Sequence, residues 1–148
     1  MTSSSTVSKI SLDNLHLVFD EPDPAKRLAE LSRLWVPSPD CMFIDPEGVY
    51  RSHEAISDVS GALQKRYLGA VFTELGNQAS PSFNELELII SARIGPVEVI
   101  NEAPDEDIRI ARLPWRYGKP GDTSAITGLD VLTIVGGKIK SLYTFIDK

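Results

Sequence analysis

Cysteine, histidine and long hydrophobic runs are all scarce in this sequence. The single cysteine, Cys41, excludes an internal disulfide, and with only two histidines it leaves no ligand set for an ordinary His/Cys metal site. Apolar runs such as residues 88–90 are far too short to cross a bilayer. We therefore expect no metal, no membrane partner and a reducing, cytoplasmic setting.

Motifs of nucleotide-dependent and nucleophilic enzymes are missing as well. The chain has no Gly-x-Ser-x-Gly elbow, no Walker loop and no dinucleotide fingerprint, and residues 118–121 lack the spacing of a phosphate loop. The net charge is -6, and acidic residues concentrate in 102–107, which opposes binding to a phosphate backbone. We expect no cofactor and no nucleic-acid partner.

What the chain does contain is enough for one globular domain. It has 148 residues, of which 42% are hydrophobic and 24% charged, and a chain of this size buries a substantial core. Residues 1–8 are rich in Ser and Thr and lack a basic start and an apolar core, so we interpret them as a flexible tail and not as a signal peptide. Residues 9–148 are predicted to form the domain.

Hydrophobic periodicity predicts three helices followed by strands. The helices are expected to start at caps Ser8, Asp23 and Ser52 and to end at 20–22, before Pro37 and at Gly69. Strands are expected at 41–44, 48–51, 70–75, 97–102, 107–117, 124–135 and 138–147. Pro114 cannot donate to a ladder, which predicts a bulge or an edge there. Residues 77–95 fit a helix or a strand equally well, and we interpret them as an insertion. This order predicts an α+β fold with a largely antiparallel sheet.

The last hairpin is the most informative segment. Gly136-Gly137 between two β-rich runs is typical of a two-residue turn, which pairs Val135 with Lys138. Counting back in step places Asp130 opposite Tyr143. The shared face is otherwise mostly apolar and comprises Ile126, Gly128, Asp130, Leu132 and Ile134 with Ile139, Ser141, Tyr143 and Phe145.

Asp130 is out of place on such a face, because an ionised carboxylate among isoleucines is unfavourable unless it is paired, hydrogen-bonded or protonated. In one interpretation it lines a pocket, has a raised pKa and can donate or accept a proton, with Tyr143 as its cross-strand partner. In the other, a buried arginine or a backbone amide satisfies it and its role is structural. The sequence leaves both open.

The opposite face of this hairpin is also apolar, with Leu129, Val131, Leu142 and Ile146 beside two threonines. A sheet that is apolar on both sides needs cover on both sides. Because the helices can cover only the concave side, we expect the convex side to pair with a second copy in a homodimer.

Several short motifs resemble one family. They are Phe43-Ile44-Asp45-Pro46-Glu47-Gly48, Ser52-His53-Glu54-Ala55-Ile56, Trp115-Arg116-Tyr117-Gly118, Thr127-Gly128-Leu129-Asp130, Gly137-Lys138-Ile139 and Leu142-Tyr143-Thr144-Phe145. In this order they resemble the SnoaL-like, or polyketide cyclase-like, branch of the nuclear transport factor 2-like superfamily over nearly the whole chain. The resemblance implies a cystatin-like cone, in which a curved sheet and three N-terminal helices enclose one pocket.

The resemblance also implies site residues. Asp45 matches the proton-abstracting aspartate of ketosteroid isomerases, and Asp130 matches their protonated aspartic acid; the pairing is a standard example of pKa tuning. Their helix tyrosine is missing here, and His16 and Tyr143 are the candidates to replace it. Asp45 also fits a turn-capping role, because Asp commonly opens Pro-containing turns. The expected pocket wall consists of Phe72, Trp115, Ile126, Leu132, Ser141 and Phe145.

Two functions follow as hypotheses. The first is a cofactor-independent isomerase, cyclase or dehydratase-type lyase that acts on a small apolar carbonyl metabolite by general acid-base chemistry. The second is a non-catalytic ligand-binding or dimerisation module of the same fold, in which the same residues are structural.

Overall fold

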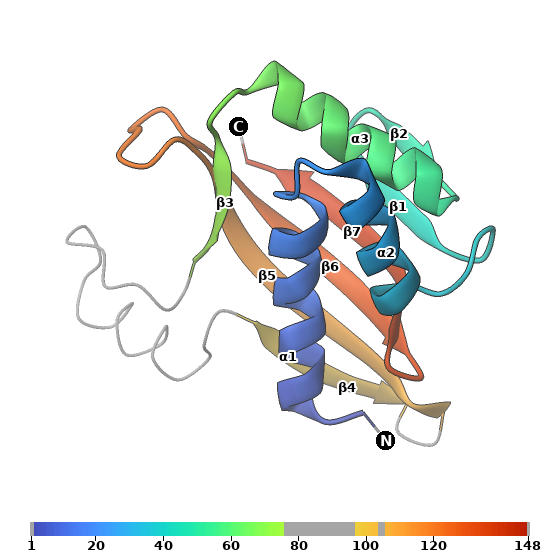
Figure 1. Ribbon diagram of the computed structural model, residues 1–148. Helices are drawn as coiled ribbons and strands as arrows, with labels where there is room; N and C mark the ends of the chain where they lie inside the picture. The colour runs from blue at the N-terminus through green and yellow to red at the C-terminus, as the bar shows by residue number, and fades with distance from the viewer. Residues whose placement is uncertain (1, 76–96, 104–105, 148) are drawn as a thin grey trace, which may run out of the picture.

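The computed structural model describes residues 2–75, 97–103 and 106–147. The helices are α1 (Ser4–Asp13), the π-helix η1 (Asn14–Val18), α2 (Pro24–Leu34) and α3 (His53–Arg66). The strands are β1 (Met42–Asp45), β2 (Gly48–Tyr50), β3 (Val71–Glu74), β4 (Glu98–Ala103), β5 (Ile108–Gly118), β6 (Ile126–Val135) and β7 (Lys138–Ile146) (Figure 1). The α+β prediction is confirmed, whereas the proposed insertion at 77–95 lies outside the described residues.

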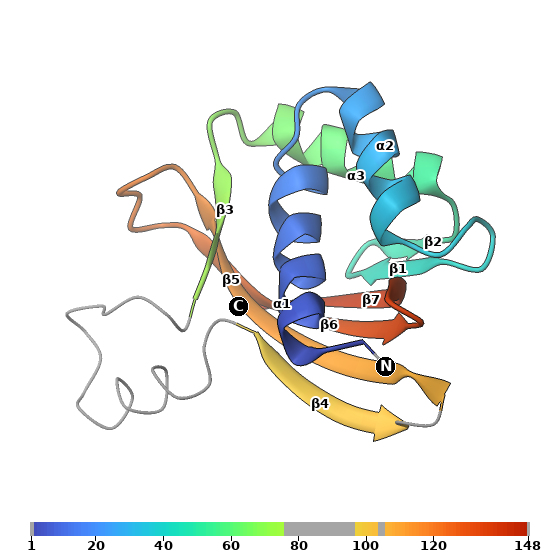
Figure 2. The ribbon, with the colours of Figure 1, turned by 60° about the horizontal axis from the view of Figure 1, so that its bottom comes forward.

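One curved sheet carries all of the strands in the described residues. Its order is β2-β1-β7-β6-β5-β3, with β4 also paired to β5; β1 and β7 run parallel and the other pairs antiparallel. Figure 2 shows the sheet bending beneath the helices, which all lie on its concave side. The sheet does not close into a barrel, so the helices complete the enclosure. No helix in the described residues is long and apolar enough to cross a membrane.

Two of the predicted helix starts are correct. The Asp23 side chain accepts a hydrogen bond from the Ala25 amide, and the Ser52 side chain accepts one from the Ala55 amide. Each cap satisfies an amide that the first helical turn leaves without a partner. These two contacts explain why α2 and α3 begin where the sequence predicts.

The predicted flexible tail at 1–8 is wrong. Helix α1 begins at Ser4, its cap is Ser3 instead of Ser8, and Val7 is fully buried. Thr2 donates from its amide and its hydroxyl to the Asp107 carboxylate, at 2.7 Å in each case, which fixes the start of the chain to the sheet. The Ser/Thr-rich composition did not predict this helix, because the helix is stabilised by packing against the rest of the domain and not by the helix propensity of its residues.

The first helix continues into the π-helix η1. Its first residue, Asn14, accepts a 2.8 Å hydrogen bond from Trp35 Nε1, which joins the end of α2 to this turn. A π turn holds an extra residue and changes the direction of the side chains that follow, a geometry common at functional sites. Leu15 and Phe19 reach the cavity described below.

The β6–β7 hairpin has the predicted turn but not the predicted register. Gly136 and Gly137 have φ values of 58° and 83°, and Val135 pairs with Lys138. Ile134 then pairs with Ile139, but Thr133 pairs with Ser141, so Lys140 is an extra residue. Such a bulge shifts every later pair by one position and exchanges the two faces of β7.

Pro114 lies within β5 without a bulge in the β5–β6 ladder, where it pairs with Leu129. On the other edge of β5, the β3 ladder stops at Trp115 and the β4 ladder starts at Arg112. The Pro114 carbonyl accepts from the Leu75 amide on that side, so the prolyl nitrogen also points there. The backbone N–H that proline lacks would therefore point between the ends of the β3 and β4 ladders, where no strand residue pairs with Pro114.

Candidate functional site

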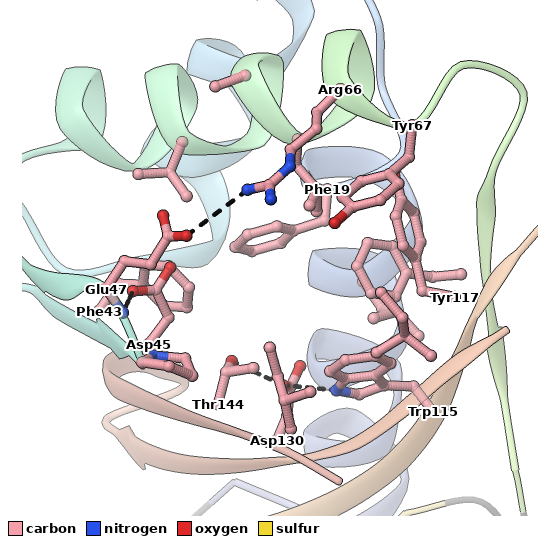
Figure 3. Close-up of a pocket in the computed structure, with 18 of the residues that line it drawn as sticks. Phe19, Phe43, Asp45, Glu47, Arg66, Tyr67, Trp115, Tyr117, Asp130 and Thr144 are labelled. Atoms are coloured by element: carbon pink, nitrogen blue, oxygen red, sulfur yellow. Dashed lines mark hydrogen bonds and ion pairs between the residues drawn. The ribbon is translucent and has the colours of Figure 1, made fainter. Parts of the chain in front are cut away.

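A cavity of about 360 Å³ lies between η1, α3 and the concave face of the sheet (Figure 3). This volume is near the lower end of the range for small-molecule pockets, which runs from about 300 to 1,000 Å³. Aromatic rings form much of its wall, with Phe72 at the centre: its centroid is 5.1 Å from that of Trp115, 4.3 Å from that of Tyr117 and 6.3 Å from that of Phe19. The cavity therefore suits an apolar ligand of modest size.

Asp130 is the buried acidic group of this wall. Asp130 is only 4% exposed. Its Oδ1 accepts hydrogen bonds from Trp115 Nε1 at 2.9 Å and from Thr144 Oγ1 at 2.8 Å. Figure 3 shows both donors converging on the carboxyl from neighbouring strands. Oδ2 makes no hydrogen bond to any described residue, so one oxygen is occupied and the other is available.

Burial raises the pKa of Asp130 from its usual 3.8 to about 6, because the ionised carboxylate loses the hydration that it has in water. The hydrogen bonds from Thr144 and Trp115 stabilise the anion and lower the pKa, but they only partly oppose the effect of burial. Near neutral pH this carboxyl can therefore exist in both protonation states.

Gly128 makes the position of Trp115 possible. The two residues face each other across β5 and β6, and a Cβ at position 128 would overlap the Trp115 ring and lie 2.5 Å from the Phe145 carbonyl oxygen. With no side chain at 128, the indole lies across β6 and brings Nε1 to Asp130. The glycine is thus required by a close approach.

Tyr117 supplies a second polar group. Tyr117 is 3% exposed and lines the cavity. Its hydroxyl has no hydrogen-bond partner among the described residues. Burial, together with the charge of Asp20 and the neighbouring Tyr67, raises the pKa of Tyr117 to about 12, so the phenol stays protonated. An unpaired buried hydroxyl is unfavourable, and a ligand oxygen would satisfy it.

The β1–β2 turn and the end of α3 meet on the side of the cavity away from Asp130. Asp45 Oδ1 accepts from the Glu47 and Gly48 amides at 2.8 and 2.9 Å, so Asp45 caps its own turn while also lining the cavity. Glu47 Oε1 lies 3.7 Å from Arg66 Nη1, which links this turn to α3. Because both side chains of this ion pair are exposed, the link is weak.

The prediction that Tyr143 lies opposite Asp130 is wrong. The extra residue Lys140 puts Thr144 there instead, and Tyr143 pairs with Val131, which places its side chain on the convex face of the sheet. Ser141 and Phe145 share that face with Tyr143, so none of the three lines the cavity. Leu132 keeps its inward direction but is fully buried in the core instead of lining the cavity.

His16 lies outside the cavity lining, at the edge of β3. Its Nε2 is 2.6 Å from Glu74 Oε2 and its Nδ1 is 3.4 Å from Asp20 Oδ2. The hydrogen bond to Asp20 and the contact with Glu74 raise the pKa of His16, although partial burial opposes this. The imidazole therefore joins η1 to β3 and does not contact the cavity.

Five of the predicted site residues come together around the cavity, namely Asp130, Asp45, Phe72, Trp115 and Ile126. Sequence reasoning missed Thr144, because the bulge reversed its face, and Tyr117, although Tyr117 belongs to the Trp115-Arg116-Tyr117-Gly118 motif. It also missed Arg66, the last residue of α3, and Tyr67, the C-cap of that helix. Tyr67 continues the apolar spacing of the helix, which predicts burial but does not single out a cavity. Within the described residues, no group of three or more His, Cys, Asp or Glu side chains is placed to hold a metal ion.

Comparison with known proteins gives a clear result for the fold. No protein-family model matches the chain, and no curated protein matches it at a significant level. Among solved structures, a putative isomerase of the SnoaL-like family from Agrobacterium tumefaciens superimposes with a TM-score of 0.66 and 17% identity, over 97% of this chain and 99% of that chain. A nuclear transport factor 2-like superfamily protein from Salmonella enterica gives 0.64 and 16%, over 100% and 94%.

A third structure comes from Catenulispora acidiphila and is a protein with a ketosteroid isomerase-like fold in complex with trimethylamine. It superimposes with a TM-score of 0.55 and 11% identity, over 93% of this chain and 84% of that chain. At such low identities these likenesses concern the fold. The chain has the nuclear transport factor 2-like fold, as its motifs predicted, and its chemistry has to be argued from its own residues.

Proposed function

We propose that this protein binds a small apolar carbonyl compound in its cavity and acts on it by cofactor-independent general acid-base chemistry, as an isomerase or cyclase. The observation that carries this proposal is Asp130: a buried carboxyl with one free oxygen in an apolar cavity, its pKa raised to about 6. General acids and bases work best when their pKa is close to the working pH.

The hydrogen bonds support Oδ2 as the oxygen of Asp130 that would move protons. The indole N–H of Trp115 can only donate, so Oδ1 has to accept in both protonation states. A proton on this carboxyl therefore resides on Oδ2, the oxygen without a protein partner. In the proposed reaction, Oδ2–H donates to the carbonyl oxygen of the substrate and stabilises the enolate as it forms.

A second group has to take the proton from carbon, and Asp45 is our candidate. It lines the same cavity, and only its Oδ1 is engaged by backbone amides. Its carboxylate removes a proton from the carbon next to the carbonyl. Return of that proton to another carbon gives an isomer. Attack of the enolate carbon on a second carbonyl carbon closes a ring, and the proton taken up by Asp45 passes to the alkoxide oxygen that this attack forms.

The alternative is a non-catalytic ligand-binding module, and one observation favours it. The hydrogen bonds to Asp130 come from two neighbouring strands and those to Asp45 come from its own turn, which are the partners that structural carboxylates also have. In this alternative Asp130 positions Trp115 and Thr144, and the cavity only holds its ligand.

Exchange of α-protons in D₂O, followed by NMR, separates the two functions. We would use 2-octanone as a simple probe beside a panel of small polyketide, terpenoid and steroid ketones. We expect the wild type to accelerate exchange and Asp130→Asn to slow it by roughly 100-fold or more. The control is Asp58→Asn, which removes the same charge from an exposed position on α3. Ligand-induced thermal shifts without any accelerated exchange would establish the binding module instead.

We also propose a homodimer through the convex face of the sheet. An apolar row crosses four adjacent strands on this face and consists of Val49, Ile44, Tyr143 and Val131. Val49 is 54% exposed and Phe145 56% exposed, and apolar side chains gathered on an open sheet face are typical of an interface. A monomer in light scattering at micromolar concentration would refute this pairing.

For the location of the protein we propose the cytoplasm. The support is chemical: Cys41, the single cysteine, is buried and free, which fits a reducing compartment. A fluorescent fusion that accumulates outside the cytoplasm would contradict this.

A further inference from the structure

A second hollow adjoins the cavity where α3 ends and the β5–β6 turn begins. It has a volume of about 440 Å³, and we call it the rim groove. Its lining comprises Lys65, Arg66, Tyr67, Leu68, Ala70, Tyr117, Gly118, Lys119, Asp122, Ser124, Ala125 and Ile126. Arg66, Tyr67, Tyr117 and Ile126 line both hollows. The two hollows therefore adjoin, and these four side chains form the wall that they share.

The rim groove has the opposite charge to the rest of the protein. Three cationic side chains line it, Lys65, Arg66 and Lys119, against the single carboxylate of Asp122, while the whole chain has a net charge of -6. Asp122 keeps its charge, because the hydrogen bonds that its Oδ1 accepts from the Ser124 hydroxyl and amide lower its pKa, so three cations against one anion leave an excess of two positive charges in the lining. A cationic groove on an acidic protein attracts anions to that place.

The cations come from different parts of the chain and converge. Lys65 and Arg66 end α3, whereas Lys119 follows β5 and lays its side chain over Gly69, with Cε 3.5 Å from where a Cβ of that glycine would lie. Neither lysine forms an ion pair with any described residue. Arg66 has a weak contact with Glu47 at 3.7 Å and a guanidinium carbon 5.3 Å from the centroid of the Tyr67 ring. An anion could therefore be bound here without breaking a strong interaction.

A buried group without a partner lies in the wall between the two hollows. Tyr117 lines both of them, is 3% exposed, and its hydroxyl has no hydrogen-bond partner within the described residues. Since a buried donor without an acceptor is unfavourable, a polar ligand atom at this point would stabilise the hydroxyl. A purely apolar ligand confined to the cavity would leave it unpaired.

We propose that the ligand is an amphipathic anion, whose apolar body fills the cavity up to Asp130 and whose carboxylate or phosphate lies between Lys65, Arg66 and Lys119. The proposal rests on the proposed function for the ligand's carbonyl end. The orientation follows from charge: Asp130, itself a carboxyl, disfavours a second anion beside it, while the rim groove favours one. The substrate class is thus an oxo acid or an acyl compound with a phosphate-bearing tail.

The experiment uses four probes with the same eight-carbon chain: octanoate, octyl phosphate, 2-octanone and octylamine. Affinities are measured by calorimetry for the wild type and for the double variant Lys65→Gln/Lys119→Gln. Two partly exposed ion pairs together change affinity by about fivefold, so we expect the wild type to bind the two anions about fivefold more tightly than 2-octanone. The double variant should lose this preference and bind 2-octanone as before.

The matched control is Lys26→Gln/Lys140→Gln, which removes two exposed lysines outside both hollows and should keep the preference for anions. Carboxylate and phosphate are distinguished by comparing octanoate with octyl phosphate. Equal affinities of the wild type for all four probes, or an anion preference that survives in the double variant, would overturn this proposal and leave the proposed function intact. Failure of every probe to bind the wild type, 2-octanone included, would count against both.

Discussion

Replacing Asp130 by Asn tests how strongly the apolar cavity disfavours an ionised carboxylate. Asn has nearly the same shape, its oxygen can accept the bonds from Trp115 and Thr144, and its amide takes the place of the free oxygen. The substitution therefore removes the titration of the carboxyl while keeping the contacts made by Oδ1. What changes is the dependence of stability on pH.

The magnitude follows from the raised pKa. A group whose pKa is higher in the folded protein stabilises the fold at low pH, and this contribution is lost as the pH rises through the folded value. The pKa of Asp130 is about 6 in the folded state and its usual value is 3.8. Between pH 5 and pH 8 the free energy of unfolding of the wild type should therefore fall by about 1.4 kcal/mol relative to that of Asp130→Asn. For a domain of 148 residues, this corresponds to roughly 3–6 °C in Tm.

Urea denaturation of both proteins at pH 5 and pH 8 measures this difference. Far-UV circular dichroism is the suitable signal, because tryptophan fluorescence would report the altered neighbour of Trp115. Other titrating groups cancel, since the two proteins share them, and Asp58→Asn controls for net charge. Stability curves that stay parallel for wild type and Asp130→Asn across this range would show that Asp130 is already ionised at pH 5 and would refute the argument from burial.

Three further predictions concern the neighbours of this group. Gly128→Ala should destabilise the fold by about 1–3 kcal/mol and change the near-UV circular dichroism, because the new methyl group overlaps Trp115; unchanged spectra and stability would contradict the close approach. Tyr117→Phe should slightly increase the stability of the free protein, by removing an unpaired hydroxyl, and in calorimetry it should weaken the binding of octanoate more than that of 2-octanone. His16→Gln should be less stable than the wild type at pH 6, and the difference should shrink as the pH rises through the raised pKa of His16; a difference in thermal unfolding that grows toward high pH would contradict this.

Much of the fold could be predicted because local chemistry and global packing agree. Asp23 and Ser52 cap helices that begin where the pattern places them, and Gly136 and Gly137 adopt the positive φ values that their turn requires. The start of α1 could not be predicted, because Val7 is stabilised by burial against distant residues and Thr2 by a bond to Asp107. Both contacts involve residues far apart in the sequence, so neither could be predicted from the composition of residues 1–8.

The site was only partly predictable for a related reason. Asp130 stands out in any register, since a carboxylate on an apolar strand needs an explanation. Its partners depend on the register, and one unpaired residue, Lys140, exchanged Tyr143 for Thr144. Trp115 was expected as a wall residue, but its hydrogen bond to Asp130 depends on the space that Gly128 leaves.

The bulge at Lys140 also bears on how this fold diversifies. Substitutions alter a cavity one side chain at a time, whereas gaining or losing one codon at this place exchanges every β7 residue beyond it between the interior and the dimer-facing surface that we propose. Two descendants of one ancestor could then present different chemistry to their ligands with almost identical sequences. Alignments that score residues by identity alone would miss the change, and pocket residues in distant members are better matched by strand pairing.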